Sequence, residues 1–205
     1  MSIDIIKAHL DVSRETCDSL EKYAALLQKW QPAKNLIANS TLPDLWERHF
    51  LDSAQLYPLI RKIHGERELT YLDIGSGAGF PGLVLSAMGL GQAHMVESNH
   101  KKAIFMGQVA RSNKLQAKVH NERIEDLDVF PVDLITSRAC ATIEKLLDWT
   151  RPFIGEATEM WLLKGAIADD ELTLAKKSWT MEIERFESLT DSSGVILRLY
   201  NIKNI

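Results

Sequence analysis

The spacing of apolar residues changes character near residue 67 of this 205-residue chain. Before that point, apolar side chains recur at three- and four-residue intervals, as in Leu20, Tyr23 and Leu27. This spacing places them on one face of a helix, which can then be buried. We therefore interpret residues 1–66 as a helical extension.

Two helices are expected within this extension. The first runs from about 13 to 30 and ends at Gln31-Pro32, because proline disfavours the helical conformation of the residue before it. The second starts after an N-cap at Ser40 or Thr41 and ends before Pro58. Within it, His49 and Asp52 lie three residues apart, and we interpret them as fixing the extension to the rest of the protein. Three tryptophans at helical spacing are expected in the core rather than as base-stacking platforms: Trp30, Trp46 and Trp149.

From residue 67 onward, short apolar runs alternate with helical stretches. Strands are expected at 70–74, 93–97, 118–121, 133–137 and 160–163, and helices at 81–88, 101–113, 143–150 and 169–177. Such alternation is typical of right-handed crossovers onto a parallel sheet. The tail departs from it, with strands at 181–188 and 195–201 joined by the turn Asp191-Ser192-Ser193-Gly194. Residues 67–205 are therefore predicted to form an α/β domain whose sheet ends in an antiparallel pair.

Composition excludes several classes of protein. The chain is 45% hydrophobic and 25% charged, which is ordinary for a globular domain. No apolar run approaches the ~20 residues of a membrane span, and the N-terminus lacks the pattern of a signal peptide. The two cysteines, Cys17 and Cys140, are too isolated for a metal cage or a disulfide framework. We expect a cytoplasmic protein, without metal or membrane association, and a monomer.

Charge is unevenly distributed along the chain. The formal net charge is −4, so no global basic field attracts nucleic acid. One segment is nevertheless basic, with six cations against the single acid Glu122: Lys101, Lys102, Arg111, Lys114, Lys118 and Arg123. Such a run is either a solvated helix face or a patch that binds phosphate.

A glycine-rich turn follows the first expected strand, in the run Asp73-Ile74-Gly75-Ser76-Gly77-Ala78-Gly79-Phe80-Pro81-Gly82. Glycine adopts positive φ and has no side chain, so a ligand can lie directly against the backbone. The helix that follows offers unpaired N–H groups at its N-terminus. Because nucleotides bind at the carboxyl ends of strands in open α/β sheets, the run predicts a nucleotide site.

Two nucleotide ligands match this turn. Gly77 to Gly82 satisfy G-x-G-x-x-G and Glu97 ends the next strand, which is the dinucleotide fingerprint. Asp73, however, would repel a pyrophosphate, whereas S-adenosylmethionine has no phosphate and carries a sulfonium and an ammonium. Glu97 suits the ribose hydroxyls of either ligand. The pattern favours S-adenosylmethionine, with a nicotinamide dehydrogenase as the alternative.

The same run resembles motif I of the bacterial 16S rRNA guanine-N7 methyltransferases, the family also called glucose-inhibited division protein B, because Phe80-Pro81-Gly82 follows the glycines. Three further segments are similar to motifs of that family: Arg48-His49-Phe50-Leu51-Asp52-Ser53 with the preceding Asn35-Leu36, Ile135-Thr136-Ser137-Arg138-Ala139, and Leu162-Leu163-Lys164-Gly165. The matches occur in order from residue 35 to residue 165.

The resemblance implies a class I S-adenosylmethionine-dependent methyltransferase: a Rossmann-like, mostly parallel seven-stranded sheet with a terminal antiparallel strand and an N-terminal helical extension. It implies methyl transfer to N7 of one guanine of 16S rRNA, position 527 in the 530 loop, with the small ribosomal subunit as partner. A methyltransferase of a small molecule or protein, and a non-catalytic sensor of the donor, remain alternatives.

Carried over residue by residue, the resemblance implies a donor site lined by Gly75 and Phe80. Ile124 and Glu125 would flank the adenine, and Arg138 would complete the pocket near the transferred methyl. The whole set expected to bind the donor is Asp73, Gly75, Gly77, Gly79, Phe80, Glu97, Ile124, Glu125 and Arg138. Glu97 stands where the family usually has Asp.

Chemistry at guanine N7 requires no general base, because N7 already carries an in-plane lone pair. Arg138 and Lys164 are therefore expected to position the reactants, and Cys140 to pack rather than attack. The alternative for Arg138 is an ion pair with Glu125 or Glu144, and for Lys164 an exposed place at a strand end. With an RNA substrate, five cations of the basic segment become candidates for phosphate contact: Lys101, Lys102, Arg111, Lys114 and Arg123.

Overall fold

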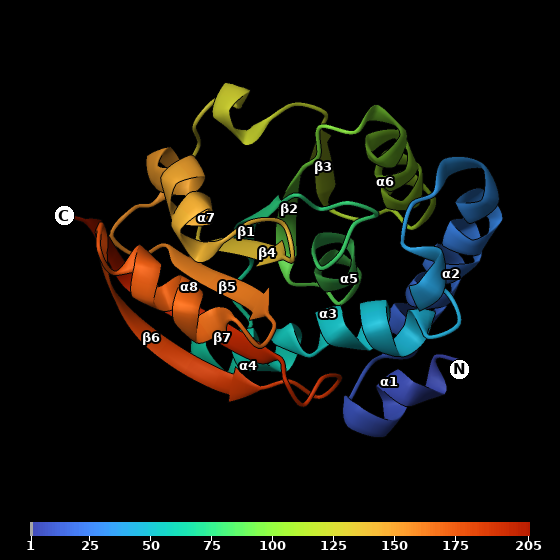
Figure 1. Ribbon diagram of the computed structural model, residues 1–205. Helices are drawn as coiled ribbons and strands as arrows, with labels where there is room; N and C mark the ends of the chain where they lie inside the picture. The colour runs from blue at the N-terminus through green and yellow to red at the C-terminus, as the bar shows by residue number, and fades with distance from the viewer. Residues whose placement is uncertain (1) are drawn as a thin grey trace.

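The computed structural model describes residues 2–205 and has a seven-stranded sheet between two layers of helices (Figure 1). The strands are β1 (Leu69–Ile74), β2 (Gly91–Val96), β3 (Ala117–His120), β4 (Leu134–Arg138), β5 (Glu159–Lys164), β6 (Trp179–Glu187) and β7 (Val195–Asn204). Their order across the sheet is β3-β2-β1-β4-β5-β7-β6. Strands β1 to β5 pair in parallel, and β7 runs antiparallel to both β5 and β6. The predicted mostly parallel sheet with an antiparallel end is confirmed.

Apolar residues alternate along the central strands, and each set faces its own layer of helices. Leu72 of β1 and Ile135 of β4 belong to one buried cluster, and their chain neighbours Tyr71 and Leu134 belong to another. Successive side chains of a strand point to opposite faces, so both faces of this sheet are covered. A parallel sheet covered in this way leaves its carboxyl edge as the natural place for a ligand.

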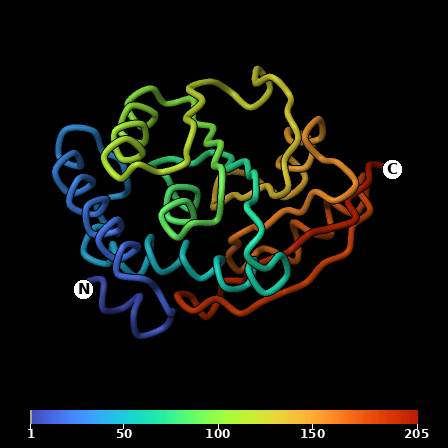
Figure 2. The backbone as a smooth tube through the Cα atoms, turned by 180° about the vertical axis from the view of Figure 1, so that it is seen from behind, coloured from blue at the N-terminus to red at the C-terminus, as the bar shows by residue number. Residues whose placement is uncertain are grey.

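The helices divide between the two faces. One face packs against α4 (Leu56–His64), α5 (Gly82–Ala87) and α6 (His100–Ser112), and the other against α7 (Ile143–Thr150) and α8 (Ala168–Ala175). Outside α5 and α6 lies α2 (Arg14–Lys34), with α1 (Asp4–His9) beside it, as the view from behind shows (Figure 2). Within residues 2–205, no helix is long and apolar enough to cross a membrane.

The extension differs from its prediction at both prolines. Helix α2 continues past Pro32 to Lys34, because a proline in the last turn removes only one hydrogen bond, and the left-handed Asn35 ends the helix. The second expected helix is irregular. It comprises a 3₁₀ turn η1 (Asn39–Thr41), a π-helical turn η2 (Trp46–Leu51), the short α3 (Asp52–Ala54) and then α4, which includes Pro58 in its first turn.

The extension and the glycine turn share one apolar core. The ring of Tyr23, on α2, stacks on Phe80 at 5.3 Å between centroids and meets Phe50 of η2 edge-on at 5.0 Å. The hydroxyl of Tyr23 donates a hydrogen bond to the carbonyl of Ala78, in the middle of the glycine turn. Helix α2 therefore supports the turn from behind.

This support predicts the effect of Tyr23→Phe. The substitution leaves the buried carbonyl of Ala78 without its donor, so we expect the free energy of unfolding to fall by about 1–3 kcal/mol. Denaturant unfolding measures this change. Tyr57→Phe is the control, because Tyr57 is partly exposed and lies on α4, where its ring faces Arg61. An equal loss in both variants would contradict a specific role for the bond to Ala78.

Candidate functional site

Two adjoining cavities lie at the carboxyl edge of the sheet, and Gly75 lines both. The smaller has a volume of about 250 Å³ and lies over the ends of β1 and β2. Its walls include Val96, Glu97, Ile124 and Glu125. The larger, of about 550 Å³, extends from the glycine turn past Arg138 to the loop between β6 and β7. Most of the sequence-predicted donor residues line one or both of these cavities, whereas Asp73 and Gly79 line neither.

The glycine turn is shaped by positive φ angles and by Glu97. Gly75 and Gly77 have φ of +65° and +59°. One carboxylate oxygen of Glu97 accepts the N–H of Gly77 at 2.9 Å, and the other accepts the N–H of Asn99 at 2.7 Å. Glu97 therefore ties β2 to the turn, and each of its oxygens keeps a lone pair for a ligand hydroxyl.

Asp73 is not where the sequence reasoning placed it. It was expected beside the ligand, but it is fully buried and lines neither cavity. Its carboxylate accepts the hydroxyl of Thr136 at 2.7 Å and the N–H of Gly82 at 3.2 Å, so it joins β1 to β4 and caps α5. Burial raises the pKa of Asp73 to about 6, although these hydrogen bonds oppose the shift. The carboxylate thus holds the turn from within.

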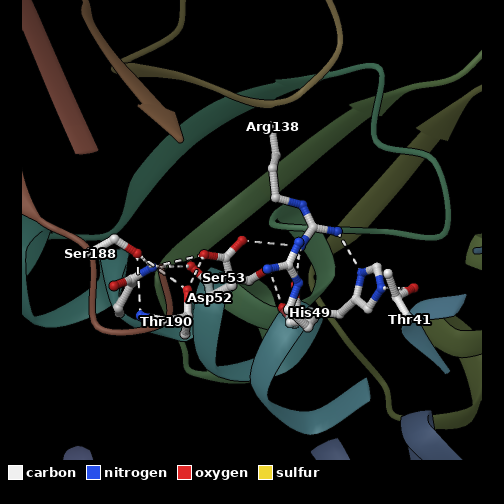
Figure 3. Close-up of polar contacts among 9 residues, drawn as sticks. Thr41, His49, Asp52, Ser53, Arg138, Ser188 and Thr190 are labelled. Carbon is white, nitrogen blue, oxygen red and sulfur yellow. Dashed lines mark hydrogen bonds and ion pairs between the residues drawn. The ribbon is translucent and has the colours of Figure 1, made fainter. Parts of the chain in front are cut away.

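Arg138, at the end of β4, lines the larger cavity, and Figure 3 shows its polar contacts. Its guanidinium donates to the Arg48 carbonyl at 2.8 Å, to Asp52 at 3.1 Å and to Nδ1 of His49 at 2.8 Å. It also lies over the ring of Phe80, 5.1 Å from the centroid. The ion-pair partner of Arg138 is therefore Asp52, which comes from the extension, and the alternative of an ion pair with Glu125 or Glu144 was wrong.

Hydrogen bonding fixes the tautomer of His49. The hydroxyl of Thr41 donates to the Ala38 carbonyl at 2.9 Å, so its oxygen accepts from Nε2–H of His49 at 2.8 Å. Nδ1 then keeps its lone pair and accepts from Arg138. Burial, with the charges of Arg138 and Arg48, lowers the pKa of His49 to about 3. His49 is therefore a neutral acceptor that orients the guanidinium.

A second set of contacts ties this centre to the loop after β6. Asp52 accepts from the hydroxyl of Thr190 at 2.7 Å and from the amide of Gln55 at 3.0 Å. The side-chain oxygen of Gln55 accepts the N–H of Leu189 at 2.7 Å. Figure 3 shows Asp52 between Thr190 and the Arg138 guanidinium. The interpretation of His49 and Asp52 as anchors agrees with these contacts, although the anchored partner is Arg138 itself.

Lys164 lines the larger cavity, but its ammonium is engaged. It donates to the Ala141 carbonyl at 2.5 Å and to Glu171 at 2.7 Å, and only 6% of its side chain is exposed. The same carboxylate of Glu171 accepts the N–H of Ile143, at the start of α7. The alternative of an exposed strand-end lysine is therefore wrong, since the charge is neutralised inside the fold.

The structure divides the basic segment. Lys101 and Lys102 begin α6 at the carboxyl edge, where Lys102 lines the larger cavity, and Arg123 lines the smaller. Arg111 lies at the other end of α6, roughly 13 Å along the helix from Lys102, and Lys114 follows it. A helix places residues at its two ends on opposite edges of the sheet, so the five cations do not form one patch.

Several lining residues escaped sequence reasoning. Trp149, expected only in the core, also lines the smaller cavity, and so does Cys140, whose thiol has a pKa raised chiefly by burial. Thr190 and Asp191 line the larger cavity from a loop with no recognisable motif. The sheet order, in which β7 pairs with β5, brings the loop between β6 and β7 to the carboxyl edge of the sheet, and the sequence pattern does not reveal this order. In residues 2–205, no group of three or more His, Cys, Asp or Glu side chains is placed to hold a metal ion.

The site suits S-adenosylmethionine chemically. The smaller cavity offers the apolar walls of Val96 and Ile124 for a base and the carboxylate of Glu97 for ribose hydroxyls, and Gly75 lines both this cavity and the larger one. An added Cβ at Gly75 would lie 2.2 Å from Sγ of Cys140, so only glycine fits at this position between the two cavities. With the sheet order described above, this arrangement defines a class I S-adenosylmethionine-dependent methyltransferase.

Solved structures share the fold. The plantazolicin methyltransferase BpumL, in complex with S-adenosylhomocysteine, superposes with a TM-score of 0.59 at 13% identity, covering 92% of this chain and 97% of that one. A TehB-like S-adenosylmethionine-dependent methyltransferase from Corynebacterium glutamicum gives 0.56 at 18% identity, over 88% and 96% of the two chains. At these identities, the likeness concerns the fold.

Sequence comparison gives the family. The family model for rRNA small subunit methyltransferase G (GidB) matches residues 16–198, and the chain belongs to this family. The Ribosomal RNA small subunit methyltransferase G of Rhodospirillum centenum is 48% identical, covering 96% of this chain and 89% of its own length. That of Rhodospirillum rubrum is 45% identical over 98% of each chain. The resemblance drawn from the motifs is confirmed.

Gly75→Ala tests the residue that lines both cavities. Relieving the overlap displaces the turn or Cys140, both of which line the cavities, so we expect affinity for S-adenosylmethionine to fall about tenfold or more. Titration calorimetry measures it. Gly89→Ala is the matched control, because Gly89 has φ of +80° with nothing within 4 Å of its added Cβ. Equal losses of affinity would attribute the effect to backbone strain alone.

His49→Gln tests the neutral histidine, because glutamine retains one donor and one acceptor without titrating. The unfolded chain protonates His49 near pH 6.5, whereas the folded chain resists protonation until about pH 3. Wild-type stability should therefore fall as the pH drops from 6.5, more steeply than in the variant by up to about 1.4 kcal/mol per pH unit. Denaturant unfolding between pH 7 and pH 4 measures both slopes. Identical slopes would mean that the folded protein carries His49 protonated.

Proposed function

We propose that this protein transfers the methyl group of S-adenosylmethionine to N7 of one guanine of 16S rRNA, at position 527 in the 530 loop, within the small ribosomal subunit. Membership of the family supports the acceptor. The observation that carries the chemistry is a glycine turn and a fixed guanidinium, that of Arg138, facing one cavity. We further propose that the protein acts as a monomer in the cytoplasm.

The donor side follows from the smaller cavity. Glu97 would accept the ribose hydroxyls, Ile124 and Glu125 would flank the adenine, and Gly75, Gly77 and Phe80 would hold the remainder. Gly79 lines neither cavity and would act by shaping the turn, with φ of +102°. Asp73 contributes by fixing that turn rather than by touching the ligand. When bound, S-adenosylmethionine supplies an electrophilic methyl group on its sulfonium.

The acceptor side requires placement, not proton transfer. N7 attacks with its own lone pair, so the protein must hold the base in line and exclude water. Arg138 uses three of its five N–H groups on His49, Asp52 and the Arg48 carbonyl. The remaining two suit guanine O6, beside N7. Arg138 therefore positions the base without occupying the reacting atom.

Lys164 takes a positioning role in this proposal. With two of its three ammonium protons committed to Ala141 and Glu171, it holds the loop that follows Arg138. The third proton has no acceptor within residues 2–205. Glu171 in turn links this loop to α7 and α8.

RNA contact is assigned to the cations at the carboxyl edge. Lys101, Lys102 and Arg123 would face phosphates beside the site, and Arg111 and Lys114 would reach the RNA only if it extends along α6. A chain of net charge −4 cannot rely on a global field, so affinity should depend on the shape of folded rRNA and decrease with salt.

Labelled methyl transfer to small-subunit particles that lack the modification tests this function. The rRNA is digested and the methylated base identified by mass. We expect N7-methylguanine at one position, and a loss of about 100-fold or more for Arg138→Gln, which cannot supply the guanidinium. Arg185→Gln is the control, because Arg185 forms an exposed ion pair with Asp169 on the surface.

Free rRNA, partial particles and complete subunits are compared in parallel, which identifies the assembly stage that is recognised. Binding of the donor without transfer to any of them would overturn the rRNA acceptor and favour a small-molecule or protein substrate.

A further inference from the structure

We propose that Asp191 recognises the Watson–Crick edge of the target guanine and so determines base specificity. This inference rests on the proposed function. It concerns the loop between β6 and β7, whose residues line the larger cavity opposite the glycine turn but carry no assigned role.

The loop is held rigidly at the cavity. Thr190, the residue before Asp191, bonds through its hydroxyl to Asp52, and the N–H of Leu189 bonds to Gln55. On the other side of Asp191, the N–H of Gly194 closes a turn onto the Asp191 carbonyl at 2.9 Å. Asp191 is therefore presented from a fixed backbone rather than from a flexible tip.

One carboxylate oxygen of Asp191 is used by the loop, and the other is not. Oδ1 accepts the N–H of Ser193 at 2.9 Å and its hydroxyl at 2.7 Å. Within residues 2–205, Oδ2 receives no hydrogen bond. The bonds from Ser193, with the charge of Arg48, lower the pKa of Asp191, so the carboxylate is ionised at neutral pH.

Guanine presents a need that this oxygen can meet. Its N1–H and N2 amino group are donors, and they require acceptors once the base leaves water. Two carboxylates line the larger cavity, Asp52 and Asp191. Both oxygens of Asp52 already accept hydrogen bonds, from Thr190 and Gln55 on one and from Arg138 on the other, whereas Oδ2 of Asp191 accepts none within residues 2–205.

The direction of the base follows from the two ends of the cavity. N7 must face the glycine turn, and O6 beside it faces Arg138. The N1–N2 edge lies across the ring from N7, so it points away from the turn, toward the loop that carries Thr190 and Asp191. Figure 3 shows Thr190 and the Arg138 guanidinium on either side of Asp52, and all three residues line the larger cavity. Adenine would place the lone pair of N1 against the same carboxylate and be repelled.

Asp191→Asn separates recognition from folding. Asparagine can keep the bonds from Ser193, but it replaces the spare acceptor with an amide donor. The substrates are small-subunit particles reconstituted with guanine or with inosine at position 527, inosine lacking the N2 amino group. Ser192→Ala, on the same turn, is the control.

Wild-type kcat/KM should fall by about 10- to 100-fold from guanine to inosine, the loss typical of one charge-assisted hydrogen bond. Asp191→Asn should lose a similar factor on guanine and much less on inosine, while Ser192→Ala behaves as wild type. Equal losses of the variant on both substrates, or equal rates of the wild type on both, would overturn the proposal. Methylation of the guanine particle by the wild type tests the proposed function separately. If it occurs, the proposed function holds even when the Asp191 variant contradicts the specificity proposal. If it does not occur, the proposed function and the specificity proposal both fail.

Discussion

The guanidinium of Arg138 is the point at which three distant parts of the chain meet. Arg138 is the last residue of the central strand β4, and hydrogen bonds to His49 and Asp52 in the helical extension orient its guanidinium. Asp52 also accepts a hydrogen bond from Thr190 in the loop after β6. A cation with only 17% of its side chain exposed requires such partners, since an unpaired charge in this position would be destabilising. The contacts that satisfy the charge also define the walls of the larger cavity, so stability and site geometry depend on the same hydrogen bonds.

Support for the donor side has a different origin. The glycine turn is held from inside by Asp73, from the neighbouring strand by Glu97 and from the extension by Tyr23. Each contact ends on a backbone group of the turn, which explains why so short a segment keeps several positive φ angles. The extension is therefore part of both halves of the site.

Local patterns predicted the sheet and the turn well, because alternating apolar residues and glycines report on local conformation. They did not predict which residue, distant in the sequence, a polar side chain would hydrogen-bond. Asp73 lies in the expected motif but faces inward, since Thr136 and Gly82 satisfy it there. Arg138 pairs with Asp52, 86 residues earlier, and no spacing rule anticipates that contact. Pro32 was predicted to end α2, but the helix continues to Lys34. A proline in the last turn removes little stability from a helix that is already stabilised by packing, and local sequence rules do not include that packing.

The insertion of β7 between β5 and β6 has a consequence for how such a protein can diversify. The segment from Ser188 to Gly194 is the tip of a hairpin whose two strands are paired along their length, and β7 is also paired with β5. Its ends are thus anchored in the sheet, while the donor turn is built from β1 and β2 on the other side of Arg138. Changes in the length or sequence of the tip could alter which acceptor is admitted while the donor side stays intact. The fold thereby separates the part that would bind the methyl donor from the hairpin tip that would contact the acceptor.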